Sequence, residues 1–359
     1  MEHSPPVRCL NLHADYLCHH SGACCTAGWT IPIERPAYEK VTLHFGRRFA
    51  VEPSDLPPGA AAIVATRPDG TCVFFDADDG RLCAIHRELG VAALPTACRQ
   101  FPRVVLHDAR GTMIGLSHFC PSAAALLRDP APPSIVDAPS NVALEGPLEG
   151  FDAREALPPL LHREMLTDAE GYAAWERGAI RVLARNDLTY DQAVEAIAAA
   201  TLTAQAWRPG GASLSDAVQR AFDRCSIPDA IEDLDADERR VSLALESVPE
   251  GLARSASFAG FRAAWPEAST IVCDFDRSVR AYLAARLFGN WVAYHVRGLH
   301  AVVEYLRICL SVLKMEAARH SACSSVSTPW QTVIEPAIRN ADLLLVHLSD
   351  MKSLARRLP

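Results

Sequence analysis

Cysteine is concentrated in the first third of this 359-residue chain, and that concentration constrains the fold more than any other feature. Seven of the twelve cysteines lie between residues 18 and 120. Thiolates are soft, charged ligands that hold zinc ions and iron–sulfur clusters, so a cysteine-dense segment indicates a bound metal centre. We predict that the metal ligands come from this set: Cys18, Cys24, Cys25, Cys72, Cys83, Cys98 and Cys120.

Disulfides and scattered core thiols are the two alternatives to a metal centre. Disulfides need an oxidising compartment, and residues 1–12 hold no apolar run of the kind that a secretory signal requires. We therefore expect a cytoplasmic protein with reduced thiols. Five cysteines outside the motifs are expected to pack as small apolar side chains: Cys9, Cys225, Cys273, Cys309 and Cys323.

The spacing of the seven cysteines does not identify the metal. Gly22 and Gly28 let the backbone curl around Cys24 and Cys25, and a short helix is expected between Cys83 and Cys98. The paired C-x-x-C spacing of common zinc sites is absent, so the sequence leaves open an iron–sulfur cluster, of the 4Fe-4S type, and zinc.

Charged and imidazole side chains accompany these thiols. Arg99 and Arg103 flank Cys98, where a guanidinium either stabilises a thiolate or forms an ordinary surface ion pair. His86 follows Cys83 by three residues and is more often a core or surface histidine than a ligand.

A proline-rich segment divides the chain. Residues 128–147 contain five prolines and no periodic apolar pattern, which is typical of a linker. We predict an α+β protein in which a small Cys-rich metal-cluster domain with short strands, residues 1–127, is followed by a mainly α-helical domain, residues 148–359. A hairpin predicted within 103–118 brings Cys98 and Cys120 to one side. Residues 62–65 and 73–75 are expected to form further short strands.

The second half has helical patterns. Thr189 and Gln192 fit a capping box ahead of an alanine-rich helix over 193–207. Leucine and valine recur at three- and four-residue steps from Leu299 to Leu313, which predicts one buried stripe on a second helix.

Membranes and nucleic acids are not expected partners. The most apolar stretch, residues 291–313, is interrupted by two histidines, two arginines and a glutamate, which would be costly in a bilayer. The net charge is −8 and no basic stripe is present, which disfavours binding to nucleic acid.

Several of these motifs resemble a known family. Gly22-Ala-Cys-Cys25, Gly80-Arg-Leu-Cys83-Ala-Ile-His86 and Cys98-Arg-Gln-Phe-Pro-Arg103 resemble the cysteine cluster of the YkgJ-type zinc- or iron-chelating proteins. Within that group, Cys24-Cys25-Thr-Ala-Gly-Trp29 and Cys120-Pro121 are most similar to flagellin lysine N-methylase. Residues 281–288 are similar to a helix in the second half of that family. Ser21 stands where the shorter pattern has a cysteine, so His19 or His20 is a candidate replacement ligand.

The resemblance implies a protein-lysine N-methyltransferase with flagellin as its protein substrate and S-adenosylmethionine as its cofactor. The chain has no G-x-G-x-x-G turn and no C-x-x-x-C-x-x-C signature of radical enzymes. Its sequence therefore identifies neither the cofactor-binding residues nor the catalytic residues. Two other functions remain open: a non-catalytic metal module that binds a protein partner, and an iron–sulfur electron carrier.

Overall fold

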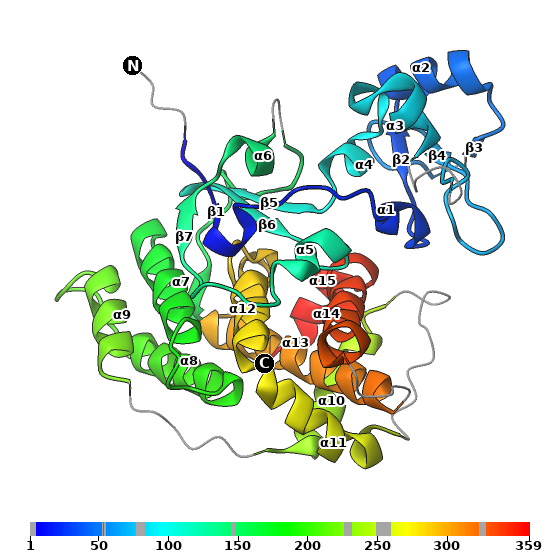
Figure 1. Cartoon of the computed structure of the whole chain (residues 1–359). Coiled ribbons are helices and arrows are strands. Elements are labelled where there is room, and N and C mark those ends of the chain that lie inside the picture. Colours follow the sequence, from blue (N-terminus) through cyan, green and yellow to red (C-terminus); the bar gives the residue numbers. More distant parts are fainter. Residues whose placement is uncertain are drawn as a thin grey trace.

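The chain has a mixed α and β structure in which helices predominate (Figure 1). The computed structural model describes residues 5–51, 53, 55–76, 83–144, 148–225, 232–248, 260–322 and 328–359. A small lobe, coloured blue to cyan in Figure 1, stands beside a larger body of sheet and helices. No helix in these described ranges combines the length and the apolar character needed to cross a membrane.

The small lobe, which we call the cysteine lobe, comprises residues 18–100. Its three-stranded sheet has the order β2-β4-β3, and its own apolar core lies between this sheet and the surrounding short helices. The elements are α1 (Ala23–Thr26), β2 (Pro32–Glu34), α2 (Arg35–Phe45), β3 (Ala50–Val51), β4 (Ala60–Val64), α3 (Ala84–Leu89), η2 (Val91–Ala93) and α4 (Thr96–Gln100).

Two strands were predicted in this lobe, and one is present. The strand expected over 62–65 is β4, whereas residues 73–75 form no strand. Because β4 already pairs on both sides with β2 and β3, residues 73–75 have no place beside it. Phe75 instead makes an isolated bridge to Cys83. The acidic segment that follows, Asp76-Ala-Asp-Asp-Gly80, lies from residue 77 on outside the described residues.

A five-stranded sheet of order β7-β1-β6-β5-β8 begins the body. Its central hairpin confirms the predicted one, with Arg103 opposite Leu116 and Asp108 opposite Gly111. The elements here are β1 (Val7–Leu10), η1 (Asn11–His13), β5 (Arg103–Asp108), β6 (Gly111–Leu116), α5 (Pro121–Ala125), β7 (Ile135–Asp137), α6 (Ser140–Ala143), β8 (Phe151–Asp152), β9 (Leu160–His162) and β10 (Met165–Leu166).

The proline-rich segment predicted as a linker is in part built into this sheet. Its residues 135–137 form β7, which pairs with β1, and the carbonyl of Val142 in α6 accepts a hydrogen bond from the Arg103 guanidinium. None of the prolines lies within β7 itself: Pro133 precedes the strand and Pro139 follows it. The boundaries of the two domains remain a prediction.

Helices form the rest of the body (Figure 1). The capping box predicted at Thr189 is present, and the helix it begins is α8. The elements are α7 (Ala169–Leu183), α8 (Tyr190–Gln205), α9 (Leu214–Asp223), α10 (Leu234–Leu245), α11 (Phe261–Asp274), α12 (Asp276–Leu287), η4 (Trp291–Tyr294), α13 (Leu299–Ser321), η5 (Trp330–Ile334), α14 (Glu335–Asp342), η6 (Leu343–Leu348) and α15 (Met351–Arg357).

Helix α13 is more deeply buried than the predicted single stripe. Polar residues such as Ser311 and Lys314 are buried along with the leucines. The reason is that α8, α10, α11, α12 and α14 all pack against it, so no face is left to solvent along most of its length. The ammonium nitrogen of Lys314 forms ion pairs there with carboxylate oxygens of Asp191, at 3.0 Å, and Asp237, at 3.5 Å.

A buried polar network joins the sheet to the helices. Arg286 of α12 lies 3.4 Å from a carboxylate oxygen of Asp342 in α14 and donates a hydrogen bond of 2.8 Å to the carbonyl of Leu116. The other carboxylate oxygen of Asp342 accepts the backbone N–H of His118. The His118 ring lies 3.2 Å from that of His13, nitrogen to nitrogen. Both imidazoles and the carboxylate are fully buried.

Candidate metal centre

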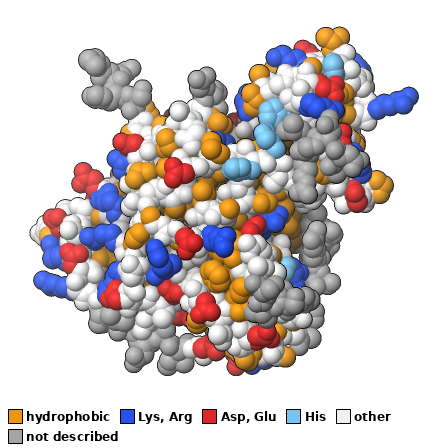
Figure 2. All heavy atoms as spheres, in the orientation of Figure 1, with side chains coloured by type: hydrophobic (Ala, Val, Ile, Leu, Met, Phe, Trp, Pro, Cys, Tyr) orange, Lys and Arg blue, Asp and Glu red, His pale blue; other side chains and the backbone are white. Residues whose placement is uncertain are grey.

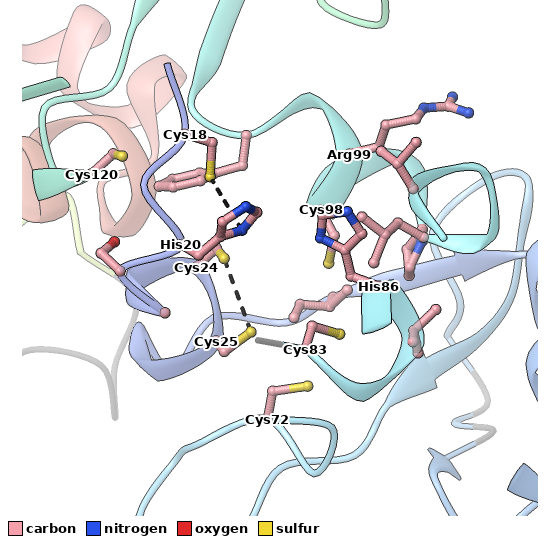
Figure 3. Close-up of a pocket in the computed structure, with 18 of the residues that line it drawn as sticks. Cys18, His20, Cys24, Cys25, Cys72, Cys83, His86, Cys98, Arg99 and Cys120 are labelled. Atoms are coloured by element: carbon pink, nitrogen blue, oxygen red, sulfur yellow. Dashed lines mark hydrogen bonds between the residues drawn. The ribbon is translucent and has the colours of Figure 1, made fainter. Parts of the chain in front are cut away.

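All seven cysteines predicted as ligands line one cavity of about 270 Å³, which we call the cysteine cavity (Figure 3). They come from separate parts of the chain: the approach to α1, α1 itself, the loop before α3, the residues that directly precede α3 and α5, and the middle of α4. None of the cysteines among the described residues is in a disulfide. Cys323 lies outside the described residues, and none of the other four cysteines assigned to packing lines the cavity. Cys9 and Cys309 are buried as expected and Cys225 is half-buried, whereas Cys273 is exposed, so the packing prediction is wrong for Cys273.

Four of the thiols form a tight group around Cys25. The Cys25 thiol interacts with those of Cys24, Cys72 and Cys83, and its sulfur lies 3.9 Å from that of Cys24. Figure 3 shows Cys25, Cys72 and Cys83 together at one end of the cavity. Four thiols are the number that holds a tetrahedral zinc ion or a 4Fe-4S cluster.

The electrostatics of this group favour ionised sulfur. Hydrogen bonds with Cys25 lower the pKa values of Cys24, Cys72 and Cys83, in the last case to about 7. Cys83 also precedes α3, where backbone N–H groups stabilise a thiolate. The same hydrogen bonds raise the pKa of Cys25, because its proton is shared with the neighbouring sulfurs, and burial and repulsion from the Cys24 thiolate act in the same direction. A cation at the centre of the group would relieve that repulsion and favour ionisation of all four.

The local backbone holds these cysteines together. Gly22 precedes α1 with φ of 75°, and a Cβ at this position would lie 2.4 Å from the Phe75 ring. Only glycine allows this approach, which brings α1 against the loop at Cys72. The N–H of Cys72 then donates to the carbonyl of Cys25 at 2.8 Å, and the N–H of Ala84 donates to the carbonyl of Phe74 at 2.8 Å.

The remaining three cysteines extend the sulfur lining. Burial raises the pKa of the Cys98 thiol. The charges of the nearby Cys24, Cys72 and Cys83 sulfurs raise it further. Cys120 lies at the other end, where its sulfur is 3.8 Å from the Tyr16 hydroxyl.

Histidines also reach the cavity. Of the two candidate replacement ligands, His20 lines it, with a ring nitrogen 3.9 Å from the Cys18 sulfur. His19 does not line the cavity, and only its backbone N–H has a contact, 3.3 Å from the Ser122 hydroxyl. The His86 ring lies 5.4 Å from that of His20, centre to centre (Figure 3). Figure 2 shows histidines exposed where the cysteine lobe meets the body.

The two arginines near Cys98 have different surroundings. Arg103 is committed to the fold, because it donates to the carbonyls of Val142 and Asn141 at 2.5 and 2.6 Å and covers the Tyr16 ring. Arg99 is exposed, lines the cavity and has no ion-pair partner among the described residues. Of the pair, Arg99 is therefore the one available to an anionic ligand.

The donor set suits a metal centre in its chemistry. Within the described part of the chain, no three Cys, His, Asp or Glu side chains already stand in a metal-binding arrangement. The 3.9 Å between the sulfurs of Cys24 and Cys25 is nevertheless close to the roughly 3.8 Å expected for two thiolates on one tetrahedral zinc. A cavity of about 270 Å³ with seven thiols exceeds the needs of a single ion and leaves room for a cluster.

Sequence patterns gave no sign of His347, which lies at the seam between the cysteine lobe and the body. Its ring is 4.5 Å from the Trp29 ring, centre to centre, and its Nε2 is 2.7 Å from the Ser117 hydroxyl. Burial lowers the pKa of His347 to about 4, so the side chain is neutral at pH 7. No motif surrounds it in the sequence, and only its distant partners reveal its position.

Acidification is expected to destabilise the body through this histidine. In the unfolded chain an imidazole takes up its proton near pH 6.5, whereas His347 in the folded chain does so near pH 4. The unfolded state therefore binds more protons in this window, and stability falls as the pH drops from about 6.5 to 4. Burial also lowers the pKa values of His13 and His118, which act in the same direction.

Thermal melting followed by circular dichroism at a series of pH values tests this expectation. The variant His347→Gln should lose less stability on acidification than the parent, while His19→Gln, at an exposed position, should follow the parent. Superimposable pH profiles for His347→Gln and the parent would contradict the assignment.

Comparison with known proteins finds no matching family model, no matching curated protein and no matching solved structure. A function for this chain is therefore inferred from its own residues and from the resemblance of its motifs.

Proposed function

We propose that this chain is a protein-lysine N-methyltransferase that modifies flagellin and carries an iron–sulfur centre in the cysteine cavity. The observation that supports the proposal is the convergence of seven cysteines on one cavity. The segments that resemble the YkgJ-type cysteine cluster and flagellin lysine N-methylase supply most of its sulfur lining: the Gly22–Cys25 segment, Cys83, Cys98 and Cys120. We propose a cytoplasmic location, where reduced thiols persist.

An iron–sulfur cluster of the 4Fe-4S type suits the size of the cavity and the number of thiols. The four thiols grouped around Cys25 would hold it, and Cys98 is the nearest further sulfur. When bound, such a cluster supplies a redox-active and positively charged core. Zinc is the second candidate because of the 3.9 Å separation between the sulfurs of Cys24 and Cys25.

Methyl transfer needs a neutral amine. The lone pair of the lysine nitrogen attacks the methyl carbon of S-adenosylmethionine, the carbon–sulfur bond breaks, and its electron pair leaves a neutral thioether on sulfur. The product is a methylammonium, and the proton that the reaction releases is the one that the lysine ammonium loses before the attack. A lysine is protonated at pH 7 in water, so a desolvated cleft that favours the neutral amine is required.

Flagellin from cells that contain this protein should be heavier than flagellin from cells that lack it. Each methyl group adds about 14 Da, because a CH₃ group replaces a hydrogen on the lysine amine. Intact-mass spectrometry measures the difference, and peptide mapping locates it on lysines. A strain that carries Cys25→Ser should match the deletion strain, whereas Cys273→Ser, at an exposed position in α11, should match the parent.

The two rival functions predict a different result. A metal module that only binds a partner leaves the flagellin mass unchanged in every strain, and so does an electron carrier. Identical masses in all strains, with the protein present and metal-loaded, would remove the methyltransferase and leave the metal centre to one of these rivals.

A further inference from the structure

A second cavity, of about 340 Å³, lies against the cysteine cavity. The two share part of their lining, including Cys24, Cys98 and Phe101. The second cavity also contacts Val346 and His347 of η6, so it lies at the seam between the cysteine lobe and the body. Its volume falls within the roughly 300–1,000 Å³ of small-molecule sites, which are common at such seams, and exceeds what a lysine side chain alone would fill.

Aromatic rings form one side of this second cavity. The Trp29 ring lies 5.2 Å from that of Phe101 and 4.5 Å from that of His347, centre to centre. Trp29 is only partly buried, and its indole N–H has no hydrogen-bond partner among the described residues. A partly open tryptophan face attracts cations, including those that carry alkyl groups.

The charges around the cavity favour a cation as well. Gln100 accepts the backbone N–H of Glu149 at 2.8 Å and donates to its carbonyl, which fixes Glu149 in the cavity wall. The Glu149 carboxylate is exposed and has no ion-pair partner among the described residues. His347 is neutral at pH 7, and the Arg103 guanidinium is directed at backbone carbonyls.

We infer that the second cavity binds S-adenosylmethionine, with the sulfonium recognised by the rings of Trp29 and Phe101 and by the Glu149 carboxylate. This inference rests on the proposed function, for which it supplies a cofactor site. The sulfonium is an alkyl-substituted cation that donates no hydrogen bond, so aromatic faces and a carboxylate are the groups that can distinguish it from a neutral thioether. The shared lining places the ligand next to the cysteine cavity.

Calorimetric titration of the full-length, metal-loaded protein tests the site. The parent should bind S-adenosylmethionine at least about tenfold more tightly than S-adenosylhomocysteine, whose sulfur is an uncharged thioether, because the aromatic rings attract the positive sulfonium. Trp29→Leu should weaken binding of S-adenosylmethionine by a similar factor, so that the protein no longer prefers it to S-adenosylhomocysteine. Trp207→Leu, which changes a tryptophan of similar exposure that lines neither cavity, should leave both constants unchanged.

Two further variants keep the test independent of folding. Thr30 is exposed and lines the second cavity, so Thr30→Arg should block it with a cation without removing a packed side chain. Glu149→Gln should reduce the preference for the sulfonium while the metal content stays that of the parent.

The outcomes separate this inference from the function on which it rests. Binding of S-adenosylmethionine that is unaffected by Trp29→Leu, Thr30→Arg and Glu149→Gln would overturn the site and leave the methyltransferase standing. Displacement of S-adenosylmethionine by n-butylamine, a mimic of the lysine side chain, would show that the cavity prefers the acceptor amine and would also overturn the assignment. Absence of any binding, together with unchanged flagellin mass, would remove both.

Discussion

Replacing Cys25 by serine is expected to abolish metal binding. The parent protein, purified without oxygen, should be brown, with broad absorbance near ~400 nm and comparable amounts of iron and sulfide. Cys25→Ser should lack both, because the Cys25 thiol contacts the three other thiols of the tight group. Since a metal site formed on folding contributes on the order of 10 kcal/mol, the cysteine lobe should also become susceptible to proteolysis.

Cys273→Ser provides the control, because Cys273 is exposed and lies in the body. It should keep the absorbance and the iron content of the parent. Retention of full metal content by Cys25→Ser would refute the ligand group. If the parent contained stoichiometric zinc and no sulfide, the centre would be a zinc site and not an iron–sulfur cluster.

Removing the charge of Asp342 is expected to destabilise the body by about 3–5 kcal/mol, the usual effect of breaking a buried ion pair. Burial alone would raise the pKa of Asp342, but Arg286 and the hydrogen bonds from His118 outweigh it and lower that pKa to about 2. Asp342→Asn leaves the Arg286 guanidinium buried without a counter-charge. Urea denaturation followed by the helical circular dichroism signal measures the loss.

Asp187→Asn is the matched control, because Asp187 pairs with Arg185 at the exposed surface. Its effect should stay below about 1 kcal/mol. The double variant Arg286→Met, Asp342→Leu should recover part of the stability that Asp342→Asn loses, since it removes the unpaired charge. An Asp342→Asn variant as stable as Asp187→Asn would mean that solvent reaches the pair.

The cysteine positions could be predicted as one group because thiols concentrated in one part of a chain have few roles other than metal binding and disulfide formation. All seven line one cavity, and their role as metal ligands stays a prediction. The finer arrangement could not be predicted: it depends on the close approach of Gly22 to Phe75 and on the backbone bond between Cys72 and Cys25. Such contacts between distant segments leave no periodic pattern in the sequence.

Local signals predicted local structure well. The capping box at Thr189 and the hairpin of β5 and β6 depend on neighbouring residues, and both are present. The pairing of β7 with β1 joins residues more than 120 positions apart, and proline content alone gave the opposite expectation for that segment. The second cavity was missed for the same reason, because Trp29 and His347 meet only through the tertiary fold.

The cysteine lobe has an apolar core separate from that of the body, and the chain enters the lobe once, ahead of α1, and leaves it once, after α4. Because cooperative unfolding as a single unit requires one continuous core, we expect two melting transitions in this protein rather than one. Chelation of the metal should melt the lobe while the helices stay folded. In calorimetry, the supply of metal would then shift one transition and leave the other in place.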